Sequence, residues 1–406
     1  MFMKIAAFFV LFLSLPSMAE RPKTPIMGWS SWNHYRIHIN EALIRSQADA
    51  MASNGMTKAG YSFINIDDGF FGGRDKNGNL FCHPDKFPSG MKALADHIKR
   101  KGLKPGIYSE AGRNTCGSIW DDDKRGFGVG LFGHEEKDLK LMLVDWGYDF
   151  IKVDWCGGQQ QKLSEQEQYM KIGRIIRRLR PEVIYNVCRW QYPGDWVKEV
   201  ADSWRISADI EAKFDSIMAI VDKAEPLWKH CSPGNFNDMD MLQVGRGMTP
   251  DEDRTHFTMW CMMVSPLLAG NDLTEMSKET LEILTHPEIV ALNQDPLCYQ
   301  ARRLRDDGEF ELWAKPLGAA DSGDVAVVLL NRGGRKSKMG FHLKEIGLNA
   351  ANSHAVRDLW QRKTLHAASR EDEYRFIVPS HGVVALRIKG EVLSGSNPFA
   401  TDSQAR

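Results

Sequence analysis

Over its first three quarters this chain alternates between short apolar segments and longer helix-like segments, and the pair recurs eight times. Eight strand–helix units over about 280 residues match a (β/α)8 barrel in number and length. We therefore predict an α/β fold with a (β/α)8 TIM barrel over residues 20–300, closed by a last helix over 277–292. The predicted strands cover residues 25–32, 61–69, 104–110, 149–156, 183–190, 203–209, 235–242 and 265–272.

The pattern changes after about residue 300, where short alternating runs are separated by turns rich in Gly, Asp and Lys. Such runs without helical periodicity are typical of an antiparallel β-sandwich. A chain of 406 residues has room for a barrel and a second small domain. We predict this antiparallel β-sandwich domain over residues 301–390, followed by a disordered tail over 391–406.

The N-terminus has the pattern of a signal peptide. Lys4 precedes an apolar run, and the small residues Ser17 and Ala19 precede a cut after Ala19. The run is short for a membrane span, and no cysteine follows the cut to carry a lipid. We expect residues 1–19 to be removed and the protein to be secreted or periplasmic, with no membrane partner.

Composition narrows the classes of function. A net charge of −1 gives no basic surplus for binding nucleic acid, and 43% hydrophobic residues are ordinary for a soluble globular protein. The seven cysteines form no CxxC pair, so we expect neither a metal site nor another cofactor. An odd number also means that at least one cysteine stays outside any intrachain disulfide.

The predicted strands end in polar and aromatic side chains, and the active site of a TIM barrel lies at these strand ends. Carboxylates facing aromatic rings suit a sugar, because rings stack on its apolar faces and carboxylates accept from its hydroxyls. An enolase-like metal barrel is disfavoured, because aromatic and basic residues occupy positions where it needs acids. The strand-end residues are Trp32, Asp67, Asp68, Tyr108, Lys152, Asp154, Arg205, Asp209, Asp240 and Asp272, the last read as a helix N-cap.

Two of these carboxylates are candidates for the catalytic pair of a retaining glycosidase, which needs a nucleophile and an acid/base about 5–5.5 Å apart. Lys152 and Asp154 lie two residues apart on one strand and so share a face. The lysine should lower the pKa of Asp154, which makes Asp154 our candidate nucleophile. Asp209, on the same strand face as Arg205, is our candidate acid/base. A structural ion pair is the alternative for Lys152 and Asp154.

Several motifs resemble glycoside hydrolase family 27, in order from about residue 23 to 297. They are Gly28-Trp29 to Trp32, Asp67-Asp68-Gly69, Gly106-Ile107-Tyr108 with Cys116, Lys152-Val153-Asp154-Trp155-Cys156, Arg205 with Asp209-Ile210, and Asn237-Asp238-Met239-Asp240-Met241. That family comprises α-galactosidases and α-N-acetylgalactosaminidases, with a few β-L-arabinopyranosidases. The resemblance implies a retaining exo-glycosidase that removes terminal α-D-galactosyl residues, with the same two catalytic residues.

The resemblance also implies roles around the sugar. Asp67 and Asp68 would bind the 4- and 6-hydroxyls and Lys152 the 3- and 4-hydroxyls, while Trp32 would pack on the ring. Tyr108 and Cys156 would line the pocket, Arg205 the 2-hydroxyl side, and Asp240 with Met241 the rim. Cys116 and Cys156 would form a disulfide between the loops after strands 3 and 4.

Two positions depart from the family pattern. Arg189 stands where α-galactosidases carry Glu after a Cys, so a donor would replace an acceptor near the 2-hydroxyl and crowd an N-acetyl group. Gly69-Phe70 replaces a frequent Cys-Trp, so we expect no disulfide there. A β-L-arabinopyranosidase, an α-N-acetylgalactosaminidase and a non-catalytic sugar-binding protein remain as alternatives.

Overall fold

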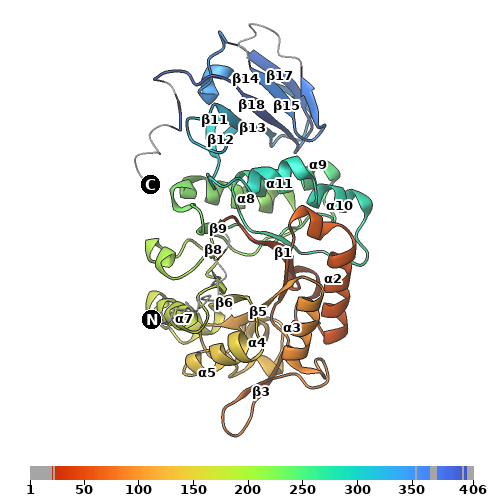
Figure 1. Ribbon diagram of the computed structural model, residues 1–406, viewed down its shortest axis with the longest axis vertical. Helices are drawn as coiled ribbons and strands as arrows, with labels where there is room; N and C mark the ends of the chain where they lie inside the picture. Colours follow the sequence, from red (N-terminus) through yellow and green to blue (C-terminus); the bar gives the residue numbers. More distant parts are fainter. Residues whose placement is uncertain (1–20, 22, 353, 366–372, 396, 400–406) are drawn as a thin grey trace, which may run out of the picture.

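The computed structural model describes residues 21, 23–352, 354–365, 373–395 and 397–399. Its described part consists of two domains stacked along the long axis of the molecule, a larger α/β domain and a smaller all-β domain (Figure 1). The predicted signal peptide lies outside the described residues. Among the residues described, no helix is both long enough and apolar enough to cross a membrane.

The larger domain is built on eight parallel strands in the order β10-β1-β2-β5-β6-β7-β8-β9. A parallel bridge between Leu242 and Ala269, with Leu242 N donating to Leu268 O at 2.7 Å, joins the two ends of this sheet. The predicted TIM barrel is thereby confirmed. The strands are β1 Met27–Ser30, β2 Phe63–Ile66, β5 Lys104–Glu110, β6 Phe150–Asp154, β7 Ile184–Val187, β8 Ser203–Arg205, β9 Phe236–Asp238 and β10 Leu267–Ala269.

These strands are shorter than the sequence suggests. The predicted strand over 203–209 ends at Arg205, and the one over 235–242 keeps only Phe236–Asp238. The polar residues that follow leave the sheet because their side chains and backbone bond to neighbouring loops. Asp240, for example, has a φ of +81° and accepts a hydrogen bond from Ile210 N. The functional positions therefore lie on loops just beyond the strands.

Helices surround the sheet, and local capping explains where several begin. Asn40 accepts from Leu43 N at the start of α2, and Thr249 with Glu252 forms a capping box around Pro250 at the start of α9. The longer helices are α2 Glu41–Ser53, α3 Gly90–Arg100, α7 Glu165–Leu179, α8 Phe214–Ala224 and α9 Pro250–Met262, and the shorter ones α1 Trp32–Tyr35, α4 Cys116–Trp120, α5 Glu135–Leu139, α6 Cys156–Gln160, α10 Lys278–Leu284 and α11 Pro287–Asn293.

Two predictions about this helical layer are wrong. The helix expected over 277–292 is broken into α10 and α11, because Pro287 disfavours a helical conformation at the residue before it. Asp272 caps no helix. Its carboxylate instead accepts from Gln47 Nε2 and from Thr274 N within a turn.

The loop after β2 folds into a projecting hairpin of β3 Phe71–Arg74 and β4 Leu80–Cys82, visible at the bottom of Figure 1. Gly72 sits where a Cβ would come within 2.4 Å of Cys82 O, so the close pairing of the two strands requires glycine there.

The smaller domain is the predicted antiparallel sandwich. A six-stranded sheet in the order β11-β12-β13-β18-β15-β16 is accompanied by the pair β14-β17. Its strands are β11 Arg302–Asp306, β12 Phe310–Pro316, β13 Asp324–Asn331, β14 Ser337–His342, β15 Ala355–Asp358, β16 Lys363–Leu365, β17 Glu373–Val378 and β18 Val383–Lys389. Part of the segment expected to be a disordered tail is ordered, because Phe399 is buried edge-on against Tyr299.

One continuous apolar core connects the two domains. Trp313, Val328 and Leu330 of the sandwich belong to the same buried cluster as the helices α9 and α11 of the barrel. The helices α8, α9 and α11 lie directly below the sandwich in Figure 1. Within this contact Lys315 of β12 is buried, and its Nζ donates to Leu292 O at 2.6 Å and to Cys261 O at 3.3 Å.

We predict that Lys315→Met lowers the free energy of unfolding by about 2 kcal/mol, because two buried carbonyl groups lose their donor. The exposed Lys389, which pairs with Asp324 at 3.2 Å, is the matched control, and Lys389→Met should change stability by less than about 0.5 kcal/mol. Urea unfolding of both variants measures this. Equal stabilities for the two variants would contradict the role assigned to Lys315.

Candidate active site

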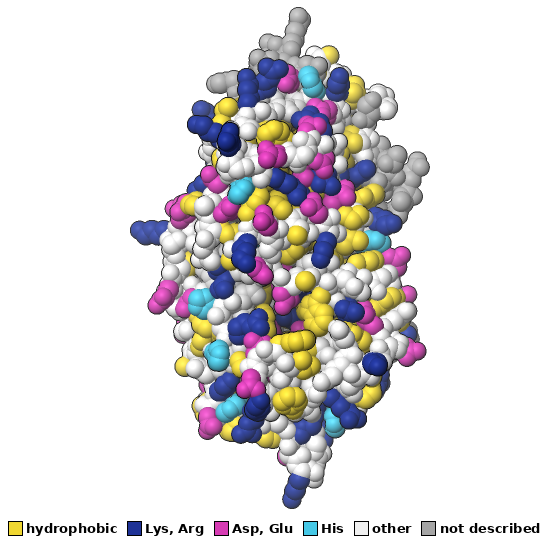
Figure 2. All heavy atoms as spheres, turned by 180° about the vertical axis from the view of Figure 1, so that it is seen from behind, with side chains coloured by type: hydrophobic (Ala, Val, Ile, Leu, Met, Phe, Trp, Pro, Cys, Tyr) yellow, Lys and Arg dark blue, Asp and Glu magenta, His cyan; other side chains and the backbone are white. Residues whose placement is uncertain are grey.

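A cleft of about 610 Å3 opens at the carboxyl ends of the barrel strands. Most of the residues predicted for the site line it, namely Trp32, Asp67, Asp68, Tyr108, Lys152, Asp154, Cys156 and Asp209. Arg205, Asp240 and Met241 line the narrow space beneath it, together with Asp67, Tyr108 and Lys152. Figure 2 shows a hollow in one face of the larger domain where hydrophobic, acidic and basic side chains lie together.

The floor of the cleft contains a buried ion pair between Lys152 and Asp67, with Nζ 2.9 Å from Oδ2. The two side chains come from neighbouring parts of the sheet, because β5 lies between β2 and β6. Tyr108 on β5 is also buried, with its ring centre 5.5 Å from Lys152 Nζ. This arrangement differs from the expected pairing of Lys152 with Asp154, since the lysine bonds directly to another carboxylate.

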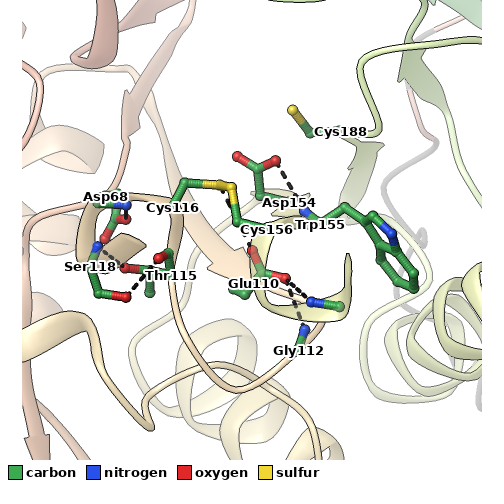
Figure 3. Close-up of a disulfide and its surroundings, with 12 residues drawn as sticks. Asp68, Glu110, Gly112, Thr115, Cys116, Ser118, Asp154, Trp155, Cys156 and Cys188 are labelled. Atoms are coloured by element: carbon green, nitrogen blue, oxygen red, sulfur yellow. Dashed lines mark hydrogen bonds between the residues drawn. A yellow bond between two sulfur atoms is a disulfide. The ribbon is translucent and has the colours of Figure 1, made fainter. Parts of the chain in front are cut away.

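Asp154 is the last residue of β6 and is only 5% exposed. Its Oδ1 accepts from Trp155 N at 3.0 Å (Figure 3). Burial raises the pKa of Asp154 to about 6, and the charge of Lys152 opposes this rise only in part. Lys152 lowers the pKa of Asp154 as expected, but removal from water has the larger effect, so the net pKa lies above its usual value.

Arg205 joins Asp209 to Asp240. Its Nη2 lies 3.0 Å from Asp209 Oδ1 and 2.8 Å from Asp240 Oδ2. Arg205 and Asp209 are therefore in contact, but they do not share a strand face as predicted, because β8 ends at Arg205 and Asp209 lies on the loop beyond it. The arginine and Asp240 are buried, whereas the Asp209 side chain is 58% exposed. Burial opposes ionisation of Asp209, but the nearby charges of Arg205 and Lys152 hold its pKa below its usual value.

The side chain of Asp68 is fully buried and anchors the next loop. Its Oδ2 accepts from Gly117 N at 2.7 Å and its Oδ1 from Gly69 N at 2.8 Å. Burial raises the pKa of Asp68 to about 7. Because Asp68 fixes the beginning of α4, it contributes to the shape of the cleft wall as well as to its lining.

The predicted disulfide between Cys116 and Cys156 is confirmed, and it joins the first residues of α4 and α6. Glu110 lies beneath this disulfide in Figure 3, and its Oε1 accepts from Gly112 N at 2.9 Å and from Gly158 N at 3.2 Å. Burial and the charge of Asp154 raise the pKa of Glu110 to about 8. Glu110 was not among the predicted site residues, although its position at the end of β5 could have marked it.

Glu110, Cys116 and Cys156 are also the group of potential metal ligands found among the described residues. The two sulfur atoms are bonded to each other, so neither is available as the thiolate that a metal requires. These three residues therefore have a structural role in joining the segments that follow β5 and β6.

Arg189 does not line the cleft. Its Nε lies 2.6 Å from Glu165 Oε2 at the start of α7, and its guanidinium carbon lies 5.8 Å from the ring centre of Trp190. The neighbouring Trp190 lines the cleft instead. Trp120, at the end of α4, also lines it and was missed, although the predicted Cys116–Cys156 disulfide could have marked this segment as a neighbour of the cleft.

Comparison with known proteins identifies the family. The sequence model described as alpha galactosidase A matches residues 24–295, and that of the alpha galactosidase C-terminal beta sandwich domain matches residues 307–388. The chain belongs to glycoside hydrolase family 27. Alpha-galactosidase A of Cellvibrio japonicus is 38% identical over 93% of this chain and 96% of its own length.

Solved structures of this family agree with the fold. Alpha-galactosidase I of Mortierella vinacea superposes with a TM-score of 0.85 at 33% identity, covering 92% of this chain and 99% of that one. The α-galactosidase of Saccharomyces cerevisiae, solved with raffinose, superposes with a TM-score of 0.76 at 26% identity, covering 90% and 97%. As a family 27 member, this chain is a glycoside hydrolase.

Proposed function

We propose that this glycoside hydrolase removes terminal α-D-galactosyl residues from oligo- or polysaccharides with retention of configuration. The observation that carries the proposal is the placement of Asp154 and Asp209 on one cleft, above a buried pair of Asp67 and Lys152. Relatives named α-galactosidases, one of them solved with raffinose, support the choice of galactose.

The floor of the cleft favours the end of a sugar chain over its middle. The buried Asp67 can accept from a hydroxyl, while Lys152, whose side chain is 17% exposed, donates to the same or the next hydroxyl. A pyranose ring bound there has the barrel core behind it, so only a terminal residue fits. Aromatic rings at Trp32 and Trp190 on the cleft wall offer apolar faces for the ring to pack on.

The two carboxylates take the two roles of a double displacement. Asp154 attacks the anomeric carbon and forms a glycosyl ester, while Asp209 gives a proton to the oxygen of the departing group. Asp209 then takes a proton from water, which attacks the same carbon and releases the sugar and Asp154. The α configuration is thereby inverted twice and retained.

These steps require an ionised Asp154 and a protonated Asp209, whereas without a bound sugar the pKa of Asp154 lies above that of Asp209. Substrate binding changes the pKa values of both carboxyl groups. The sugar removes water from the half-exposed Asp209, which favours its neutral form, and sugar hydroxyls near Asp154 donate to its charged form. Asp209 also exchanges its bond with Arg205 for one with the glycosidic oxygen.

Two related substrates remain alternatives within the family. L-Arabinopyranose differs from galactose by lacking the exocyclic CH2OH, and Asp67 is the residue expected to sense that group. The argument from Arg189 against an N-acetyl group loses its basis, because this side chain pairs with Glu165. Rates on the para-nitrophenyl glycosides of the three sugars separate these substrates.

The direct test of the nucleophile is Asp154→Asn. We predict that it lowers kcat on para-nitrophenyl α-D-galactopyranoside on the order of 10⁴-fold or more, because the amide cannot form the ester. Galactose binding and the melting temperature should change little. Asp96→Asn on the exposed face of α3 is the matched control and should be fully active. Undiminished turnover by Asp154→Asn would contradict the mechanism, and lack of any hydrolysis by the wild type would favour a sugar-binding protein.

The pKa of Asp154 also predicts the pH profile. Since the mechanism needs an ionised Asp154 and a protonated Asp209, and the pKa of Asp154, about 6, lies above that of Asp209, kcat/KM should fall as the pH rises through about 6. Lys152→Met should move this limb to higher pH, because the lysine charge favours the carboxylate, whatever its effect on the maximal rate. An alkaline limb at the same pH in both proteins would contradict the assignment.

A further inference from the structure

Two short helices extend the wall of the cleft outward from the catalytic residues. The disulfide joins them at their first residues, Cys116 of α4 and Cys156 of α6. Trp120 and Gln160 each follow their cysteine by four positions, so each lies on the same face of its helix as the cysteine. Both line the cleft, as does Gln159. The disulfide therefore fixes α4 against α6, which begins two residues after Asp154.

Trp120 is unusually exposed for an indole. Its exposed fraction is 74%, whereas that of Asp154 in the same cleft is 5%, so Trp120 lies toward the mouth. The other large exposed hydrophobic residues of the described chain are Phe81, Phe127, Val144 and Ile377, and none of them lines this cleft. An indole face open to water beside an active site is suited to stacking on a sugar ring.

Hydrogen bonds at both ends of α4 hold the helix that carries Trp120. Asp121, the next residue, accepts a bidentate hydrogen bond from Arg36, with N–O distances of 2.7 to 3.0 Å. The Arg36 guanidinium in turn lies 4.2 Å from the ring centre of Trp32. Asp68 binds the amide of Gly117 at the other end of α4. The helix is thus fixed at both ends, and little conformational freedom is lost when a ligand binds on it.

The cleft is large enough for more than one ring. Pockets of roughly 300–1,000 Å3 enclose ligands of the size of a disaccharide, and this cleft has about 610 Å3. Its wall beyond Asp209 combines the indole of Trp120 with the amides of Gln159 and Gln160, which can donate to and accept from hydroxyls. Aromatic and amide groups together match a carbohydrate better than a purely apolar group.

We propose that Trp120, Gln159 and Gln160 bind the sugar that leaves on hydrolysis, and that Trp120 determines the preference for that sugar. The inference rests on the proposed function and adds the residues that select the leaving group. The terminal galactose occupies the buried floor, and the second ring stacks on Trp120 at the mouth. Binding there places the glycosidic oxygen beside Asp209.

The test compares two substrates that share galactose and differ in the leaving group. Melibiose carries a second sugar, glucose, whereas α-D-galactosyl fluoride carries only fluoride. Trp120→Ala should lower kcat/KM on melibiose about tenfold and leave hydrolysis of the fluoride unchanged within about twofold. Trp120→Phe, which keeps an aromatic face, should retain most of the activity on melibiose.

Phe127→Ala is the matched control, because Phe127 is 50% exposed and does not line the cleft. It should leave both activities unchanged. Equal losses on the two substrates, or no loss on melibiose, in a Trp120→Ala protein that melts like the wild type would overturn the subsite. Failure of the wild type to hydrolyse galactosyl fluoride would instead overturn the proposed function, and with it this inference.

Discussion

The active site depends on two buried cations that allow several carboxylates to be packed at one end of the barrel. Lys152 neutralises Asp67, and Arg205 neutralises Asp240 and reaches Asp209. Each pair costs desolvation free energy that its attraction only partly offsets, so these residues add little to stability. They give instead a polar floor that is already desolvated and fixed before a sugar arrives.

Asp154 is left without a direct cation in this arrangement. Its raised pKa follows from burial, and the nearest positive charge is engaged with Asp67. In its proposed role as the nucleophile, Asp154 keeps its reactivity toward carbon because it is only weakly neutralised, and the charge of Lys152 still favours its ionised form. Glu110 beneath the disulfide is coupled to it, because burial and the charge of Asp154 both raise the pKa of Glu110.

The sequence was sufficient for the architecture and for most of the cleft lining, because strand ends of a barrel converge wherever the strands are correctly located. Asp67, Lys152, Asp154 and Asp209 were found in this way. Prediction from the sequence failed where a side chain can pair with any of several residues that are distant in the sequence. Lys152 bonds to Asp67, 85 residues away, and Arg189 turns to Glu165. Trp120 was missed because it lies on the short helix α4, whose end is held by the pairing of Asp121 with Arg36, 85 residues away, and no local pattern indicates this contact.

The most direct measurement for this account is the anomer released first from para-nitrophenyl α-D-galactopyranoside, followed by proton NMR before mutarotation equilibrates the product. Attack by Asp154 and then by water predicts that α-galactose appears first and the β anomer accumulates only later. Initial release of β-galactose would contradict the covalent role of Asp154, since it would mean that water attacks the substrate directly.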